Sequence, residues 1–282
     1  PNLIRAARSR DIPMLLVNAR LSPKSARRYA RVDGLTRDAL QGLSAVGAQS
    51  DADAQALVTL GARHVEVTGN MKFDVEPPQS AISAGYALRQ SFGARPAWVA
   101  ASTREGEEEL LLHALSLLEA KSALLILVPR HPQRFDEVAV MIERAGLVYQ
   151  RRSAKQPIAA STRVLLGDSM GELNVYYAAG DIAFVGGSLK PFGGQNLIEP
   201  CALGKPVLFG PYTYNFATAA EAALASGAAR RVRDAGTLMS ELDRLFRDAN
   251  ERVRMGAAAL QFASLHRGAT NKTLALVEPL LR

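Results

Sequence analysis

The sequence predicts an α/β fold in which helices pack on parallel sheets and the chain forms two domains. Short runs rich in leucine or β-branched residues alternate with amphipathic segments along the whole chain, which is typical of βα units. The length of 282 residues suits two domains. The pair Pro77 and Pro78 interrupts both the strand and the helix periodicity. We therefore expect one domain over residues 1–76 and a second over residues 77–282.

Strands are expected wherever a short apolar run is followed by a polar or glycine-rich turn and then by a helical pattern. Parallel strands covered on both faces read as continuous apolar runs, and most of these runs have that character. The expected strands cover residues 13–17, 45–48, 65–68, 97–101, 123–128, 164–166, 181–185 and 206–209.

The expected helices are recognised by their first residues and their periodicity. Ser50 can cap a helix whose first turn carries Asp51 and Asp53, two acids that complement the helix dipole. A helix is also expected to begin at Ser102, with Glu105 completing a capping box. Helical periodicity predicts three further helices near the C-terminus, over residues 238–246, 253–265 and 270–281.

The two expected domains differ in completeness. Residues 1–76 hold three strands, which is too few for a whole doubly wound domain but suits the second half of one. Residues 77–282 are enough for a complete nucleotide-binding domain with C-terminal helices.

Composition excludes several classes of protein. Hydrophobic residues make up 48% and charged residues 22%, which does not fit a disordered chain or a coiled coil. The single cysteine, Cys201, excludes an intrachain disulfide. The longest apolar run, residues 123–128, is much shorter than a membrane span. The four histidines lack the spacing of metal ligands, so a zinc site is not expected. No cofactor is expected.

The net charge of +7 predicts a surface that attracts polyanions, such as nucleic acid, anionic lipid or phosphorylated substrates. The densest basic stretch runs from Arg20 to Arg31 and includes Arg27 and Arg28. It contains one aromatic residue, Tyr29, which is few for stacking bases. The stretch is either a solvated helix face or an anion site, and composition does not decide between them.

Ligands of parallel α/β sheets bind at the carboxyl ends of the strands, so the residues after each strand are the candidate site. Two Gly-Gly pairs and Asn196 follow the strand at 181–185, and a helix is expected to start near Gln195. Its free N–H groups would meet a phosphate, and Glu199 in its first turns would accept ribose hydroxyls. The alternative is a structural glycine turn in which Glu199 only favours the helix dipole.

Three other loops follow expected strands. Pro129, Arg130 and His131 follow the strand at 123–128, and the guanidinium of Arg130 can bind phosphate in a bidentate manner. The segment 167–172 offers backbone donors and the adaptable side chain of Met170. Lys72 precedes the domain boundary, where an ammonium can stabilise a departing phosphate. The alternative for Arg130 is a surface arginine in a proline turn, and for the segment 167–172 it is a capped turn. For Lys72 the alternative is a salt bridge to Asp74.

Several of these segments together resemble one family. The long run FVGGSLKPFGGQNLIEPCALGKPVLFGPYTYNF is joined in order by VNARLS, AQSDADAQALVTLGA, VTGNMKFD, LVPRHPQRF and GDSMGEL. These segments resemble 3-deoxy-D-manno-octulosonic acid (Kdo) transferases of lipopolysaccharide synthesis, from residue 1 to about residue 246. The resemblance implies two Rossmann-like domains of the GT-B type, and transfer of Kdo from CMP-Kdo to a lipid A precursor (lipid IVA) with inversion and without a metal.

The resemblance also implies roles for individual residues. Lys72 matches a lysine regarded as a transition-state stabiliser. Gln195 and Phe192 stand where the family commonly has His and Arg. The positions implied to bind the donor are Pro129, Arg130, Met170, Gly171, Glu172, Asn196, Leu197, Ile198 and Glu199.

The resemblance sets expectations for the N-terminus and the location. Family members carry an N-terminal membrane anchor and a glutamate that acts as general base, and both precede the segment that matches Pro1 and Asn2. We therefore expect an incomplete N-terminal domain and no Kdo transfer by this polypeptide alone. The implied location is the cytoplasmic face of the bacterial inner membrane, reached through the missing anchor, with no nucleic acid as partner.

Two rival functions account for part of the pattern. A nucleotide-sugar epimerase of the same fold explains the glycine loop and Glu199, and would prefer UDP to CMP. A basic nucleic-acid-binding module is favoured by the isoelectric point of 9.8 alone.

Overall fold

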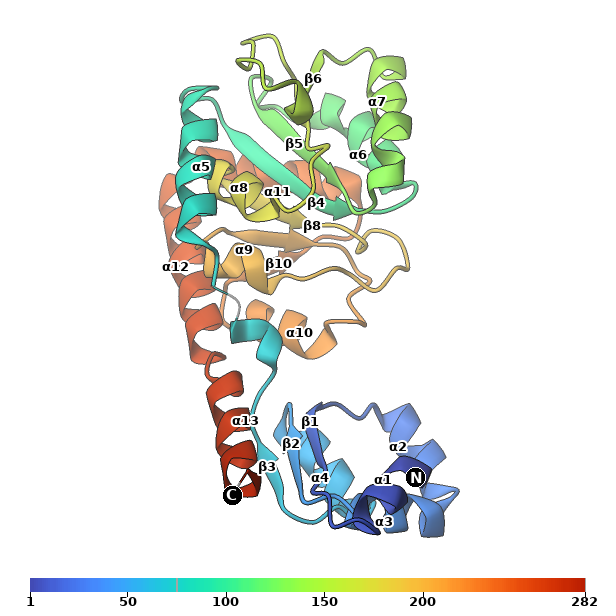
Figure 1. Cartoon of the computed structure of the whole chain (residues 1–282). Helices are drawn as coiled ribbons and strands as arrows, with labels where there is room; N and C mark the ends of the chain where they lie inside the picture. The colour runs from blue at the N-terminus through green and yellow to red at the C-terminus, as the bar shows by residue number, and fades with distance from the viewer. Residues whose placement is uncertain (75, 282) are drawn as a thin grey trace. The chain divides into compact units, whose positions relative to one another are not determined.

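Figure 1 shows the computed structural model of the chain, which describes residues 1–74 and 76–281. The chain forms two compact units. Unit 1 consists of residues 1–75 and 265–282, and unit 2 of residues 76–264. The second domain was expected over residues 77–282, whereas unit 2 ends at residue 264. The last helix, α13 (Ala269–Val277), belongs to unit 1 because it packs on that unit's strands, where Leu276 reaches Gly47.

Unit 1 is built on a three-stranded parallel sheet in the order β1-β2-β3. The strands are β1 (Leu15–Ala19), β2 (Ala45–Ala48) and β3 (Val65–Val67). Val46 and Ala48 of the central strand are fully buried. The other elements of this unit are α1 (Asn2–Arg8), α2 (Pro23–Ala30), α3 (Asp33–Gln41), α4 (Asp51–Thr59), the 3-10 turn η1 (Met71–Asp74) and the 3-10 turn η5 (Glu278–Leu280).

Unit 2 is built on a seven-stranded parallel sheet in the order β10-β9-β8-β4-β5-β7-β6. The chain starts at the central strand β4, runs through β5 to β7 on one side, and then returns with β8 to β10 on the other side of β4. The sheet is therefore doubly wound. The strands are β4 (Ala97–Thr103), β5 (Leu124–Pro129), β6 (Tyr149–Arg151), β7 (Val164–Leu166), β8 (Ile182–Val185), β9 (Val207–Phe209) and β10 (Ala229–Arg231).

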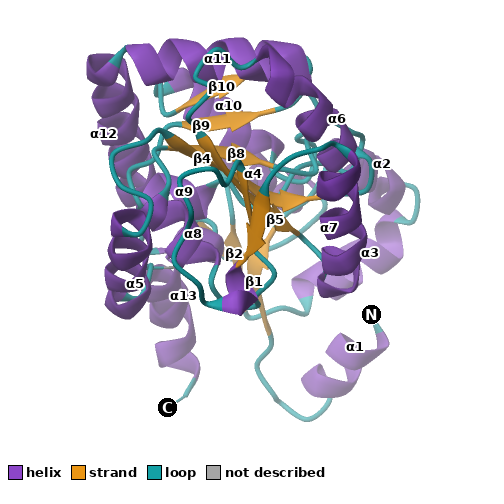
Figure 2. Ribbon diagram, turned by 90° about the horizontal axis from the view of Figure 1, so that it is seen from above, coloured by secondary structure: helices purple, strands orange, loops and turns teal. Residues whose placement is uncertain are grey.

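Helices cover both faces of this sheet, as Figure 2 shows. The helices of unit 2 are α5 (Gln79–Gln90), α6 (Glu107–Ala114), α7 (Phe135–Arg144), α8 (Leu173–Ala179), α9 (Ile198–Ala202), α10 (Ala217–Ala225) and α11 (Ala235–Arg247), and α12 (Ala249–Leu265) follows them. Short 3-10 turns lie at η2 (Leu115–Leu117), η3 (Pro132–Arg134) and η4 (Arg152–Ala154).

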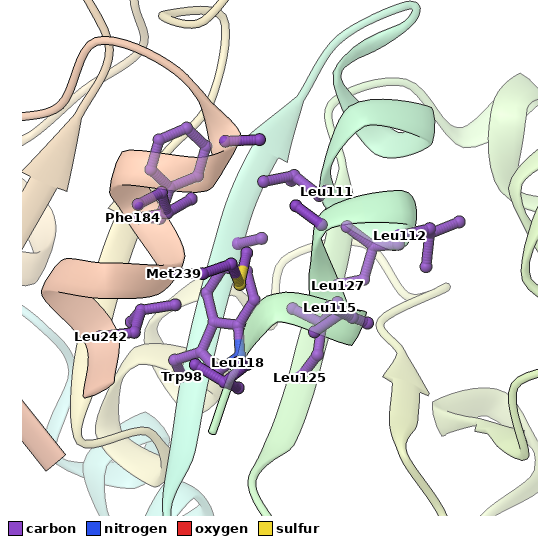
Figure 3. Close-up of a cluster of buried hydrophobic side chains, with 14 of the residues drawn as sticks. Trp98, Leu111, Leu112, Leu115, Leu118, Leu125, Leu127, Phe184, Met239 and Leu242 are labelled. Atoms are coloured by element: carbon purple, nitrogen blue, oxygen red, sulfur yellow. The ribbon is translucent and has the colours of Figure 1, made fainter. Parts of the chain in front are cut away.

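The core of unit 2 has two halves, because successive residues of each strand point to opposite faces. On one face Trp98 and Phe184 pack with α6, α7 and α11, and Figure 3 shows Trp98 surrounded by Leu118, Met239 and Leu242. On the other face the next residues along the strands pack with α5 and α8. The strands β4 and β5 are therefore covered on both sides, which explains their continuous apolar sequence.

All eight expected strands are present, with ends that differ by at most two residues, and the cap at Ser50 is confirmed by its hydrogen bond from Asp53 N at 3.2 Å. The prediction that a helix begins at Ser102 is wrong. Thr103 still pairs with Pro129, so β4 continues through Thr103 and α6 begins at Glu107. The sequence did not predict β6 and β10, two short polar edge strands. None of the described helices has the length and apolar character to span a membrane.

Candidate functional site

The candidate site of unit 2 lies at the carboxyl edge of its sheet. The strands β4, β5, β7 and β8 run parallel, so the segments that follow them meet at one edge. The structure brings three of the expected segments together there, namely 130–131, 167–172 and 186–199. A fourth segment, residues 104–107 after β4, lies between them because β4 is flanked by β5 and β8.

Arg130 and Glu199 lie close enough for their charges to interact. The backbone N–H of Arg130 donates to the Thr103 carbonyl at 3.0 Å, and its guanidinium is exposed. Burial raises the pKa of Glu199, while the amide of Asn196, which donates to it at 2.9 Å, and the positive charge of Arg130 oppose this increase. An exposed cation beside a half-buried carboxylate suits a ligand that carries both an anion and hydroxyl groups.

The helix expected near Gln195 begins later. The helix α9 starts at Ile198, whose N–H donates to the side chain of Asn196 at 3.0 Å, and it has five residues. Glu199 lies in its first turn, as the sequence predicted. The prediction that a helix near Gln195 presents free N–H groups is therefore wrong, because the glycine-rich stretch before Asn196 is an irregular loop.

The loop after β8 is held by a carboxylate that the sequence interpretation missed. Glu107 is fully buried and accepts hydrogen bonds from the N–H groups of Gly187, Ser188 and Leu189 at 2.6, 2.9 and 2.8 Å. It also accepts from the N–H of Arg104 at 2.9 Å. The amide groups of the first Gly-Gly pair are consequently occupied by the protein itself. These N–H groups are therefore not available to an anion.

The glycines of this loop are required by close packing. A Cβ at Gly186 would lie 2.7 Å from the Ser102 carbonyl oxygen and from Thr103 Cα, which no side chain allows. Ser102 itself has φ of 55°, a strained value for a residue that is not glycine. Strain of this kind is typical of functional sites.

A second buried carboxylate joins the segments after β4 and β5. Glu108 accepts from Thr103 Oγ1 at 2.7 Å and from Arg134 Nη1 at 2.8 Å. Burial raises the pKa of Glu108 in spite of these contacts. Because Arg134 ends the turn η3 that follows Arg130, this ion pair fixes the segment that carries Arg130. The segment TREGEE follows a strand, and that position is the signal that could have identified these residues.

The segment after β7 forms its own polar cluster. Burial alone would raise the pKa of Glu172, but hydrogen bonds from Ser169 and from Arg152, the latter at 3.0 Å, outweigh burial and lower it. These hydrogen bonds therefore stabilise the ionised form of Glu172. Beside it Met170 is 65% exposed, and Gly171 has φ of 78°. An exposed methionine next to polar groups can contact a planar base.

The remaining expected positions are structural or lie in unit 1. Leu197 and Ile198 are buried, and burial raises the pKa of the Cys201 thiol to about 12, so the thiol stays protonated. Lys72 lies in the turn η1 of unit 1 and is exposed. The neighbouring carboxylate of Asp74 accepts hydrogen bonds from three backbone N–H groups at the start of α13.

Comparison with known proteins gives one consistent result. A family model described as 3-deoxy-D-manno-octulosonic-acid transferase (kdotransferase) matches residues 1–75. The 3-deoxy-D-manno-octulosonic acid transferase of Bordetella pertussis is 46% identical over 99% of this chain and 66% of its own length. That of Haemophilus influenzae is 37% identical over all of this chain and 67% of its own length. The chain thus spans about two thirds of the length of these curated relatives.

Comparison with solved structures gives the same family and the same fold. The C-terminal CMP-Kdo binding domain of WaaA from Acinetobacter baumannii is 35% identical and has a TM-score of 0.63, covering 66% of this chain and 98% of that one. Anabaena HepE in complex with UDP and glucose has a TM-score of 0.60 over 98% of this chain and 73% of that one. At 20% identity the second likeness concerns the fold alone. Together they confirm the predicted fold class, α/β of the GT-B type.

Proposed function

Because the chain belongs to the family of 3-deoxy-D-manno-octulosonic acid transferases, we propose that unit 2 binds CMP-Kdo and that the protein serves in the transfer of Kdo to a lipid A precursor. The observation that carries the proposal is that Arg130 lies near enough to Glu199 for their charges to interact, at the carboxyl edge of a doubly wound sheet. An arginine for phosphate and a carboxylate for ribose hydroxyls are the two groups that a nucleotide requires there.

Each expected donor residue has a proposed task. Arg130 binds the phosphate, with Pro129 fixing its backbone at the end of β5. Glu199 accepts the ribose hydroxyls while Asn196 holds its carboxylate. Met170, Gly171 and Glu172 line the cytosine, with the apolar methionine against the face of the base. Leu197 and Ile198 form the buried base on which this part of the loop rests.

The proposed reaction is an inverting substitution at the anomeric carbon. A hydroxyl of the lipid A precursor attacks this carbon, its proton passes to a general base, and the bond from the carbon to the phosphate oxygen breaks. The electron pair leaves with CMP, which gains negative charge on its phosphate. Arg130 stabilises that charge in the donor site. For Lys72 we propose the role of transition-state stabiliser that the resemblance to the family implies.

Calorimetric titration of the purified chain with CMP and UMP tests the donor site. Nucleotide binding can be measured without the acceptor and without turnover, so it tests the donor site by itself. We expect CMP to bind more tightly than UMP, Arg130→Ala to weaken CMP binding about 10- to 100-fold, and Glu199→Gln to weaken it about 10-fold. Arg144→Ala is the matched control, because Arg144 ends α7 at the opposite edge of the sheet.

The raised pKa of Glu199 gives the same titration a pH signature. The carboxylate accepts ribose hydroxyls only when ionised, and burial makes it protonate above the ordinary value of 4.5. CMP affinity is therefore expected to fall on mild acidification more steeply in the native chain than in Glu199→Gln. Unchanged CMP affinity in Arg130→Ala, or tight binding of a short oligonucleotide in place of CMP, would overturn the proposed function.

We further propose that the protein works at the cytoplasmic face of the bacterial inner membrane, where its lipid acceptor lies. The helix α2 supports this, since it buries none of its residues and carries Arg27 and Arg28 in its last turn. Exposed arginines of this kind attract anionic headgroups. Sedimentation with vesicles containing phosphatidylglycerol should retain the chain at low salt and release it at high salt. Retention that does not change with salt contradicts the electrostatic attachment.

A further inference from the structure

We propose that Arg104 and Lys190 form the subsite for the carboxylate of the transferred sugar. The inference rests on the proposed function above, because it concerns the sugar part of CMP-Kdo. An octulosonic acid carries its carboxyl group on the anomeric carbon, and the same carbon bears the phosphate in the donor. The donor therefore presents two anions joined through one carbon, and its site needs cations for both.

The fold places two sets of cations side by side. Thr103 pairs with Pro129 across β4 and β5, so Arg104 and Arg130, the residues that follow them, leave the sheet at the same edge. Lys190 comes from the loop after β8, on the other side of β4. Its ammonium lies against Gly106, where a Cβ would be 2.7 Å from Lys190 Nζ. In this arrangement Arg130 binds the phosphate, and Arg104 and Lys190, which follow β4 and β8, bind the carboxylate.

Glu107 fixes the spacing of this second pair. Its buried carboxylate binds the N–H of Arg104 and the N–H of Leu189, the residue before Lys190. The two cationic residues are consequently attached to the same rigid carboxylate from opposite loops. Glu107 also accepts from the N–H groups of Gly187 and Ser188, so these two groups do not compete with the two side chains for an incoming anion.

The charges of the pair are incompletely neutralised by the protein. In the part of the chain that the structure describes, the ammonium of Lys190 makes no salt bridge and no hydrogen bond. The guanidinium of Arg104 lies 4.4 Å above the ring of Phe192, which holds it in place. Arg104 Nε donates to the carboxylate of Glu105 at 3.0 Å, and the side chain of Glu105 is 49% exposed. A ligand carboxylate can therefore displace Glu105 from Arg104 or bind Arg104 beside it.

Titration of the chain with CMP and with CMP-Kdo tests the subsite, because the two ligands differ by the sugar. The native chain should bind CMP-Kdo more tightly than CMP. Lys190→Gln and Arg104→Gln should each lower the affinity for CMP-Kdo about 10-fold and leave the affinity for CMP within about twofold. Glu105→Gln should raise the affinity for CMP-Kdo, because it removes a competing carboxylate. Lys121→Gln is the control for net charge, since Lys121 precedes β5 at the opposite edge.

The outcomes separate this inference from the function on which it rests. A native chain that binds neither CMP nor CMP-Kdo refutes the proposed function itself. A native chain that binds both equally, or Lys190→Gln and Arg104→Gln variants that lose both ligands in the same proportion, refutes the carboxylate subsite and leaves the nucleotide site standing. Opposite effects of Lys190→Gln and Glu105→Gln on CMP-Kdo alone support it, because a change in folding would not reverse sign with charge.

Discussion

The two units differ in how much charge they bury. Unit 2 encloses its seven-stranded sheet between helices, and it buries the ionisable side chains of Glu107, Glu108, Arg134 and Asp243. In the described part of unit 1, every buried polar side chain is a threonine. Its edge strand β1 also leaves Leu16 and Val17 partly exposed. Burial of a charge costs several kcal/mol unless it is paired, and a large apolar core offsets that cost.

Both units nevertheless use one carboxylate to hold a distant segment by its backbone. In unit 2 Glu107 accepts four N–H groups, three of them from residues 80 to 82 positions further along the chain. In unit 1 Asp74 accepts three N–H groups at the start of α13, whose own N-cap residue is a glycine. The same contact is therefore made once in a dry interior and once near the surface, which allows the effect of burial to be measured.

The largest effect is expected at the buried contact. Glu107→Ala leaves four backbone N–H groups without their acceptor, and we expect it to lower the free energy of unfolding by about 3 to 5 kcal/mol. Glu107→Gln keeps the shape but turns an NH2 group toward N–H donors, so we expect a loss of about 2 kcal/mol. Urea unfolding followed by the fluorescence of Trp98, the single tryptophan, measures both, since Trp98 lies in the core of unit 2.

Glu109→Ala is the matched control, because Glu109 lies in the same helix turn and is exposed. A change within about 0.5 kcal/mol is expected for it. If Glu107→Ala and Glu109→Ala cost the same, the buried carboxylate does not hold the loop, and the comparison between the units loses its basis.

The same contrast explains which features the sequence predicts. The strands β4 and β5 are covered on both faces, so their runs AWVAA and LLILV are visible as continuous apolar stretches. The edge strands β6 and β10 read YQR and ARR, and nothing in such short polar runs indicates a strand. Ser102 was expected to cap a helix because a local motif was present, whereas β4 continues through an irregularity at Ser102 to the pairing of Thr103 with Pro129.

The candidate site was predictable to the extent that it depends on strand ends. Arg130 and Glu199 follow or lie near the ends of recognisable strands, so the rule for parallel sheets places them at one edge. The position of the segment 103–108 after a strand could have identified it as part of the site, but the role of Glu107 was not predictable. That role depends on contacts with residues about 80 positions away, and local patterns carry no information on such pairs. Among acidic residues in a first helical turn, the sequence does not distinguish the one that turns inward.

A smaller effect is expected at the contact of unit 1, and it should depend on pH. Burial alone would raise the pKa of Asp74, but the hydrogen bonds from Thr270, Gly268 and Ala269 lower it below the ordinary 3.8. A carboxylate with a lowered pKa stabilises the fold above its unfolded value and loses this contribution as pH falls through the folded value. Asp74→Asn should therefore cost about 1 kcal/mol at neutral pH and nothing in strong acid. Hydrogen exchange of the α13 amides measures this, with the exposed Asp11→Asn as control. An equal loss of protection at both pH values would assign the effect to shape, and the charge of Asp74 would then play no part.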